Sequence, residues 1–268
     1  MKTLVLGAAY GYKPAELAPF VVSLRRHYQG DVLFITGELD QESVNFFNQH
    51  NIITFELGNV FLNPRDIQLE RYGIYKSLLE ENFNDAERVL LCDVRDVVFQ
   101  DDPFKFPAEA ELEFFHEPAL YNKCQCNGGW IKNVFGEERY DQLKDEWIIC
   151  SGTTLATGAG IMKYIDTMIE EIERVKQTGI HMFSGVDQPI HAHLAYTDAF
   201  PDQVKHHNGE GPIVTLHHQL SLTVDRQGRI LNKNSEVVPI VHQWDRMGRL
   251  KYMFEETAIN GPGPAPEV

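Results

Sequence analysis

Residues 89–104 read VLLCDVRDVVFQDDPF, and this stretch decides the predicted fold. The apolar run Val89 to Leu91 is typical of a strand that is buried on both faces of a sheet. Two carboxylates, Asp93 and Asp96, follow where that strand leaves the sheet. Ligands bind at this end of open α/β sheets, and two neighbouring acids there are costly to desolvate without a cation or a base between them. The stretch therefore predicts a divalent-metal site that carries a phosphorylated ligand.

Short apolar runs alternate with helical patterns before this stretch. Strands are predicted at 3–9, 32–36 and 52–57, and helices at 15–28, 41–49 and 66–82, the last with a start signal at Asn63 and Pro64. This alternation favours a mostly parallel central sheet flanked by helices. We expect one Rossmann-like α/β domain over residues 1–260 and a disordered tail at 261–268, where glycine and proline cannot build a core.

After Phe104, the alternation of strand and helix patterns is no longer clear in a region with aromatic residues and cysteines. Clear patterns begin again at residue 148. Further elements are predicted as a strand or turn at 148–157, helices at 160–178 and 185–195, and strands at 213–217 and 237–241. The four cysteines, in a chain of 268 residues, do not indicate a disulfide framework. Cys124 and Cys126 with His116 are an alternative zinc set, although their spacing matches no standard structural pattern.

Composition narrows the class of partner. With a formal net charge of -15, the chain lacks the clustered Lys and Arg that nucleic-acid binding needs, so any phosphate must be bound locally. No apolar run reaches the roughly 20 residues that span a bilayer, and the first residues are too briefly apolar for a secretory signal. We expect a cytoplasmic protein without a transmembrane segment, able to lie at a membrane surface.

Four other segments carry candidate site residues. In VPIVHQWDR, an apolar strand ends at His242, which can give a nitrogen to the same metal, and Arg246 can neutralise phosphate charge. In IICSGTTLATGAG, the small residues Ser151 and Gly152 permit close approach of a sugar or phosphate. The alternatives are structural: a hydrogen-bonded histidine at a strand end, and an ordinary turn.

In GVDQPIHAH, Asp187 is a candidate general base and Gln188 can both donate and accept hydrogen bonds. Alternatively, Asp187 caps a helix before Pro189. In LERYGIYK, Arg71 can reach the phosphates or the metal-binding aspartate. The acidic motif has its own alternative, in which Asp93 caps a turn and Asp96 pairs with a base.

Taken in order, the segments AAY, RYGIYK, CDVRDVVFQDDPF, SGTTLATG, VDQP and VHQWDR resemble those of the GT-A fold glycosyltransferases over most of residues 3–250. In that family, an acidic "DxD" motif binds a divalent metal and a nucleotide sugar. The resemblance implies that the nucleoside is held by Ala8 and Tyr10. It implies that Mn²⁺ or Mg²⁺ and the diphosphate are held by Asp93, Asp96 and His242. It implies that the sugar is faced by Ser151, Gly152, Asp187 and Gln188.

The acidic motif departs from the family pattern because Asp93 and Asp96 are separated by two residues, one of them Arg95. Three arrangements are open. Asp96 is the principal ligand with Asp93 behind it, or a bulge brings both to the metal, or a metal-free site uses Arg95. The segment VHQWDR also lacks the glycine and lysine that accompany the histidine in the glycogenin-like branch.

The expected function is metal-assisted transfer of a sugar from a nucleotide-diphosphate donor to a hydroxyl of a glycan, lipid or small-molecule acceptor. Asp96 is essential to it, and Asp187 is the base if the reaction inverts configuration. One alternative is a haloacid-dehalogenase-like phosphatase, because VLLCDVRDVVF also resembles a strand that ends in a nucleophilic aspartate. Another is a nucleotide-sugar binding protein without turnover.

Overall fold

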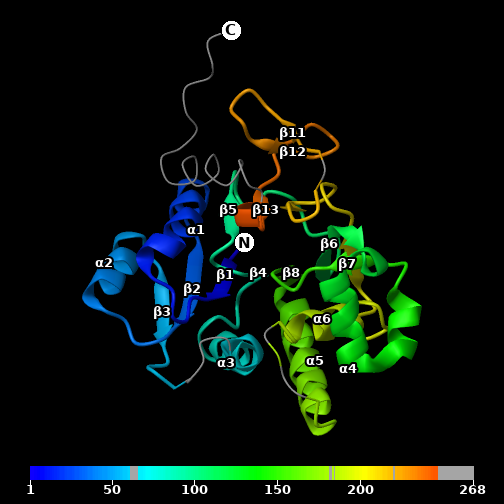
Figure 1. The fold of residues 1–268 in the computed structure, drawn as a ribbon. Helices are drawn as coiled ribbons and strands as arrows, with labels where there is room; N and C mark the ends of the chain where they lie inside the picture. The colour runs from blue at the N-terminus through cyan, green and yellow to red at the C-terminus, as the bar shows by residue number, and fades with distance from the viewer. Residues whose placement is uncertain (61–65, 181–182, 184, 220, 247–268) are drawn as a thin grey trace.

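The computed structural model describes residues 1–60, 66–180, 183, 185–219 and 221–246 (Figure 1). The expected helix start at Asn63 and Pro64, the domain end at residue 260 and the tail at 261–268 lie outside these residues. None of the described helices is long and apolar enough to cross a membrane.

The main sheet has eight strands in the order β3-β2-β1-β4-β8-β6-β7, with β9 paired to β6. Its first half is parallel and consists of β1 (Thr3–Ala8), β2 (Asp31–Thr36), β3 (Ile53–Glu56) and β4 (Arg88–Cys92). Its second half consists of β6 (Leu112–Leu120), β7 (Trp147–Ile149), β8 (Thr153–Thr157) and β9 (Gln203–His206). The pairs β4–β8, β8–β6 and β6–β7 are antiparallel, whereas β6–β9 is parallel. The sheet is therefore mixed, and the prediction of parallel strands holds for its first half.

Six helices accompany this sheet in the described part of the chain. They are α1 (Pro14–His27), α2 (Gln41–Gln49), α3 (Ile67–Asn82), α4 (Gln125–Leu143), α5 (Gly158–Gln177) and α6 (Asp187–Ala195). Figure 1 shows α1 and α2 beside the first strands, with α4, α5 and α6 gathered near the second half. Leu17, Phe20 and Leu24 recur at helical spacing and bury one side of α1.

The strand β4, which contains the apolar run Val89 to Leu91, is buried on both faces, as predicted. Val89 and Leu91 pack with residues of α3 and α5, whereas Leu90 and Cys92 pack with residues of α1. Because β4 lies in the middle of the sheet, the residues that follow it lie near the centre of the side where the parallel strands have their carboxyl ends.

Two small sheets complete the described fold. One has the order β10-β13-β5, with β5 (Val97–Phe99), β10 (Ile213–Thr215) and β13 (Ile240–His242). The other pairs β11 (Thr223–Val224) with β12 (Ile230–Leu231). Short 3₁₀ helices span Tyr121–Lys123 and Trp244–Arg246.

The predicted strands and helices up to residue 92 are confirmed to within about two residues, and so are the helices that became α5 and α6. One helix, α4, and five strands were not predicted; the strands are β5, β6, β9, β11 and β12. The strand β6 buries polar side chains, which hides its apolar pattern. The helix α4 contains two adjacent glycines and has a non-helical Gly136 in its path.

Candidate functional site

The three-stranded sheet β10-β13-β5 places His242 next to the acidic motif. Asp93 follows the last residue of β4, and Asp96 directly precedes β5. The strand β13 runs antiparallel to β5 and pairs His242 with Val97. In addition, the backbone N–H of Gln243 donates to the Asp96 carbonyl at 2.7 Å. Residues almost 150 positions apart are thus adjacent because of one short strand pair.

Asp93, Asp96 and His242 form a cluster that we call the acid–histidine cluster. One ligand atom from each lies within 4.8 Å of the others, and His242 Nε2 is 3.7 Å from Asp96 Oδ1. Carboxylate oxygens and an imidazole nitrogen suit Mn²⁺, and Mg²⁺ also binds carboxylates. Among the residues that the structure describes, no other group of three has its ligand atoms this close, so the alternative zinc set with Cys124 does not form.

His242 is oriented for ligation. Its Nδ1 lies 3.6 Å from Cys150 Sγ, and its buried Nε2 has no hydrogen-bond partner in the described part of the chain. If Nδ1 carries the proton and donates to the sulfur, Nε2 presents its lone pair to the two carboxylates. A buried nitrogen without a partner is costly, and a cation between the three side chains would satisfy it.

Gly152 closes the cluster from the loop between β7 and β8. Its carbonyl accepts the backbone N–H of Asp93 at 2.8 Å. A Cβ at this position would lie 2.7 Å from His242 Nε2 and 2.8 Å from Asp93 Oδ2. Only glycine therefore leaves room between the carboxylate and the imidazole.

The two aspartates differ in burial and in the direction of their pKa shifts. The Asp93 side chain is 42% exposed and that of Asp96 only 6%. Burial acts to raise the pKa of both carboxyls. For Asp93, Arg71 and His242 outweigh burial, so its pKa lies below the ordinary value. For Asp96, burial together with the charge of Asp93 prevails over His242, and its pKa lies above the ordinary value. The geometry favours the arrangement in which both acids face one metal, and added positive charge would lower the pKa of both carboxyls.

Arg71 of α3 bridges two acids. Its Nη1 lies 3.2 Å from Asp93 Oδ1, and its Nη2 donates to Asp187 Oδ2 at 2.8 Å. Burial alone would lower the pKa of Arg71, but Tyr72 and Asp187 foremost hold that pKa well above its ordinary value. The predicted contact between Arg71 and the metal-binding aspartate is therefore present. Asp187, the candidate base, is the buried partner of this ion pair, and its pKa is raised by burial despite Arg71.

Gln188 fixes the loop that carries Gly152. Its Oε1 accepts the backbone N–H of Ser151 at 2.7 Å, and its Nε2 donates to the Ile149 carbonyl at 2.6 Å. The side-chain amide of Gln188, which was predicted to face a sugar, is thus hydrogen-bonded to the backbone through both its oxygen and its nitrogen. In this structure Gln188 ties α6 to the β7–β8 loop.

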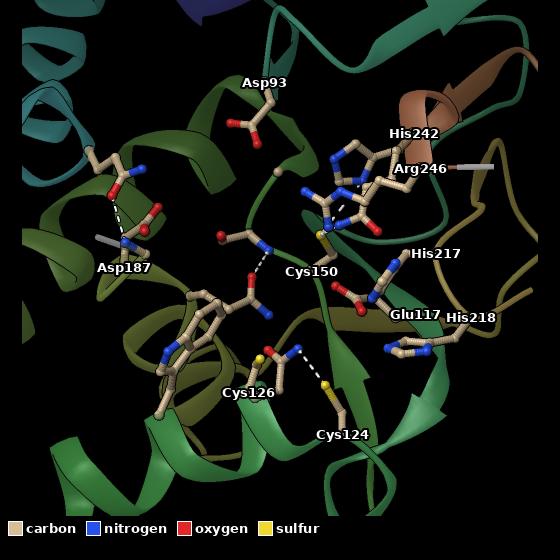
Figure 2. A pocket seen from close by; sticks show the side chains of 18 of the residues that line it. Asp93, Glu117, Cys124, Cys126, Cys150, Asp187, His217, His218, His242 and Arg246 are labelled. Atoms are coloured by element: carbon tan, nitrogen blue, oxygen red, sulfur yellow. Dashed lines mark hydrogen bonds between the residues drawn. The ribbon is translucent and has the colours of Figure 1, made fainter. Parts of the chain in front are cut away.

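A pocket of about 410 Å³ opens beside the cluster, within the usual range for small-molecule sites. The predicted site residues that line it are Arg71, Asp93, Ser151, Gly152, Asp187, Gln188, His242 and Arg246. Figure 2 shows Asp93, His242 and Arg246 on one side and Cys124 and Cys126, at the start of α4, on the other. Asp96, which is 4% exposed, belongs to the buried part of the cluster.

Four predicted residues do not line this pocket: Ala8, Tyr10, Arg95 and the buried Asp96. The Tyr10 hydroxyl donates to the Gly58 carbonyl at 3.0 Å, and its ring is buried against Gly37. Arg95 donates to Asp245 at 2.7 Å. The structure therefore does not bring Arg95 to the pocket wall, because its guanidinium is held by an acid of the 3₁₀ turn after β13.

The pocket also contains residues that sequence reasoning missed. Glu117 of β6 is 3% exposed, and its Oε2 has no partner among the described residues. Burial raises the pKa of this carboxyl. Asn127 and Trp130 come from α4. The available signal was a glutamate within the apolar run FFHEPAL, but only the tertiary structure turns it toward the pocket.

No protein-family model matches the chain, and no curated protein matches it either. The functional assignment therefore depends on the geometry of the site.

Proposed function

We propose that this protein is a glycosyltransferase of the GT-A type, which moves a sugar from a nucleotide-diphosphate donor to an acceptor hydroxyl with the help of Mn²⁺ or Mg²⁺. The single observation that carries the proposal is the convergence of Asp93, Asp96 and His242 at the edge of a pocket that fits a small ligand. The resemblance of the sequence to the GT-A glycosyltransferases implies the same three residues as holders of metal and diphosphate.

The residues fit a divalent cation in three respects. The donor set is chemically suitable, His242 Nε2 lacks a partner, and the missing Cβ of Gly152 leaves space where an ion would lie. Asp93, Asp96 and His242 would hold the ion. Once bound, a divalent cation supplies positive charge that stabilises a departing diphosphate.

The surrounding side chains have separate tasks. Arg246 Nη2 lies 3.4 Å from Asp96 Oδ2, and the side chain is 42% exposed, so it can turn toward a phosphate in the pocket. Arg71 holds Asp93 and Asp187 in fixed positions. Asp187 lines the pocket and takes the role of base if configuration inverts, although release from Arg71 would be needed for proton transfer.

The test is a thermal-shift screen of nucleoside diphosphates and their sugars, with and without Mn²⁺, because ligands that bind only the folded state raise its stability. We expect Mn²⁺-dependent stabilisation by at least one nucleotide and slow release of nucleoside diphosphate from the matching sugar. Asp96→Asn should abolish both while the chain still folds. The matched control is Asp141→Asn, which changes an exposed acid paired with Lys144 outside the pocket.

Other outcomes decide between the alternatives. Retention of wild-type nucleotide binding and turnover by Asp96→Asn would refute the proposal. Phosphate release from an aryl phosphate without any nucleotide effect would indicate the phosphatase. Tight donor binding without hydrolysis or transfer would indicate a binding protein.

A further inference from the structure

Three residues that line the pocket each carry a buried side-chain oxygen that lacks a hydrogen-bond donor. Glu117 Oε2, Asn127 Oδ1 and Gln243 Oε1 are all in residues less than 10% exposed, and none has a hydrogen-bond partner among the described residues. Leaving a buried acceptor unpaired destabilises the folded protein. The pocket is therefore matched to a ligand that brings several hydrogen-bond donors.

The other ends of these side chains are already engaged, which fixes the orientation of the oxygens. Asn127 Nδ2 donates to Cys124 Sγ at 3.4 Å, and Gln243 Nε2 lies 3.9 Å from Cys150 Sγ. The Cys150 thiol next to Glu117 acts to lower the pKa of that carboxyl, although burial outweighs it. Gln243 also has a φ of 56°, an unfavourable value for a residue with a side chain, and such strain is often found at functional sites.

An aromatic surface adjoins these oxygens. Trp130 lines the same pocket and lies three residues after Asn127 on α4, so both side chains occupy one face of the helix. Gly185 lies opposite, where an added Cβ would be 3.5 Å from the indole ring. The indole therefore offers a flat apolar surface next to polar groups, as in many small-molecule sites.

We propose that Glu117, Asn127 and Trp130 form the acceptor subsite of this pocket and that the acceptor is a saccharide. Its hydroxyl groups donate to the Glu117 and Asn127 oxygens, and the C–H face of its ring packs on the indole of Trp130. This inference rests on the proposed function, because only a transferase needs an acceptor beside the donor.

Other chemical classes fit less well. An acyl chain would leave the buried oxygens of Glu117 and Asn127 unpaired. A polycation would gain no net attraction, because the three acidic side chains of the lining are matched by three basic ones: Asp93, Glu117 and Asp187 against Arg71, Lys123 and Arg246. A neutral polyol supplies donors without adding charge.

The test is saturation-transfer NMR of maltose, lactose and cellobiose with the full chain. We expect at least one sugar to bind through its ring protons, and Trp130→Leu and Asn127→Ala to weaken that binding at least about tenfold, which corresponds to roughly 1.4 kcal/mol. Trp130→Phe keeps a flat ring and should bind nearly as well as the wild type. The control is Trp147→Leu, because Trp147 is 39% exposed and does not line the pocket.

A nucleotide thermal shift with Mn²⁺ on the same variants separates the two proposals and reports whether they fold. If nucleotides stabilise the protein but none of the three sugars binds, or if Trp130→Leu binds like the wild type, the acceptor subsite is wrong and the transferase proposal stands. If sugars bind at Trp130 but no nucleotide has an effect, the transferase proposal fails and the saccharide site remains.

Discussion

Gly152 lies so close to His242 that a Cβ at residue 152 would be 2.6 Å from His242 Cε1. The same atom would crowd the Asp93 carboxylate from the other side. No left-handed backbone angle requires glycine here, because Gly152 is not among the residues with positive φ. The glycine is therefore explained by the space between two side chains of the acid–histidine cluster.

The first prediction concerns this space. Gly152→Ala should remove Mn²⁺-dependent thermal stabilisation, because its methyl group occupies the region between Asp93 and His242. The protein should still unfold cooperatively but at a lower temperature, because rotation of Asp93 relieves only the contact with its carboxylate and the buried His242 ring must also shift. The control is Gly73→Ala in α3, where a Cβ meets nothing within 4 Å, and it should raise stability by roughly 0.5–1 kcal/mol. Unchanged Mn²⁺ binding by Gly152→Ala would mean that the metal lies elsewhere.

The second prediction concerns Arg71 and its two acids. Arg71→Met should lower the free energy of unfolding by roughly 3 kcal/mol, because it leaves the buried Asp187 carboxylate without a partner. Arg71→Met combined with Asp187→Leu should regain part of that loss, since the buried charge is removed as well. Urea unfolding of the three proteins measures both effects.

The control for this prediction is Lys76→Met in the same helix. Lys76 pairs with Asp166 at the surface, where both side chains are more than a third exposed, so the change should cost less than about 1 kcal/mol. Equal losses for Arg71→Met and Lys76→Met would show that burial of the Arg71 ion pair does not matter for stability.

The sequence predicted the first half of the fold because each strand there is a short apolar run between helices of regular period. It predicted the acidic motif because charges that end a buried strand are unusual. The pairing of Asp96 with His242 was predicted from the type of residue that ends each apolar run and from the family resemblance. The strand pairing that joins them was not predicted, because β5 and β13 carry too few residues for a pattern.

The pocket residues that come from β6 and α4 were not predicted, for a different physical reason. The strand β6 buries the polar residues Glu113, His116 and Glu117. The desolvation cost of Glu113 is offset by an ion pair with Arg88, whereas Glu117 Oε2 has no hydrogen-bond partner among the described residues. Local pattern reasoning assigns such residues to the surface. The residues of α4 were hidden by glycines that lower helix propensity but allow close approach, as at Gly128, where a Cβ would be 2.8 Å from the Tyr121 carbonyl oxygen.

The third prediction concerns pH and stability. His191 in α6 is fully buried, and its Nδ1 lies 2.7 Å from the Tyr164 hydroxyl. Burial, assisted by the charge of Arg71, lowers the pKa of His191 from 6.5 to about 3. The unfolded chain therefore binds a proton between pH 6.5 and pH 3 that the folded protein excludes.

Above pH 6.5, His191 is neutral in both the folded and the unfolded state, so its titration does not reduce the free energy of unfolding. As the pH falls from 6.5 toward 3, protonation of His191 in the unfolded chain progressively lowers that free energy. The loss approaches about 1.4 kcal/mol per pH unit, or roughly 2 kcal/mol between pH 6.5 and pH 5. His191→Gln keeps a polar group near Tyr164 but cannot titrate, so its stability should decline less over the same interval. Urea unfolding of both proteins at pH 7, 6 and 5 gives the comparison, and other titrating groups cancel because they are common to both. Parallel declines for the two proteins would mean that His191 accepts a proton in the folded state without strain.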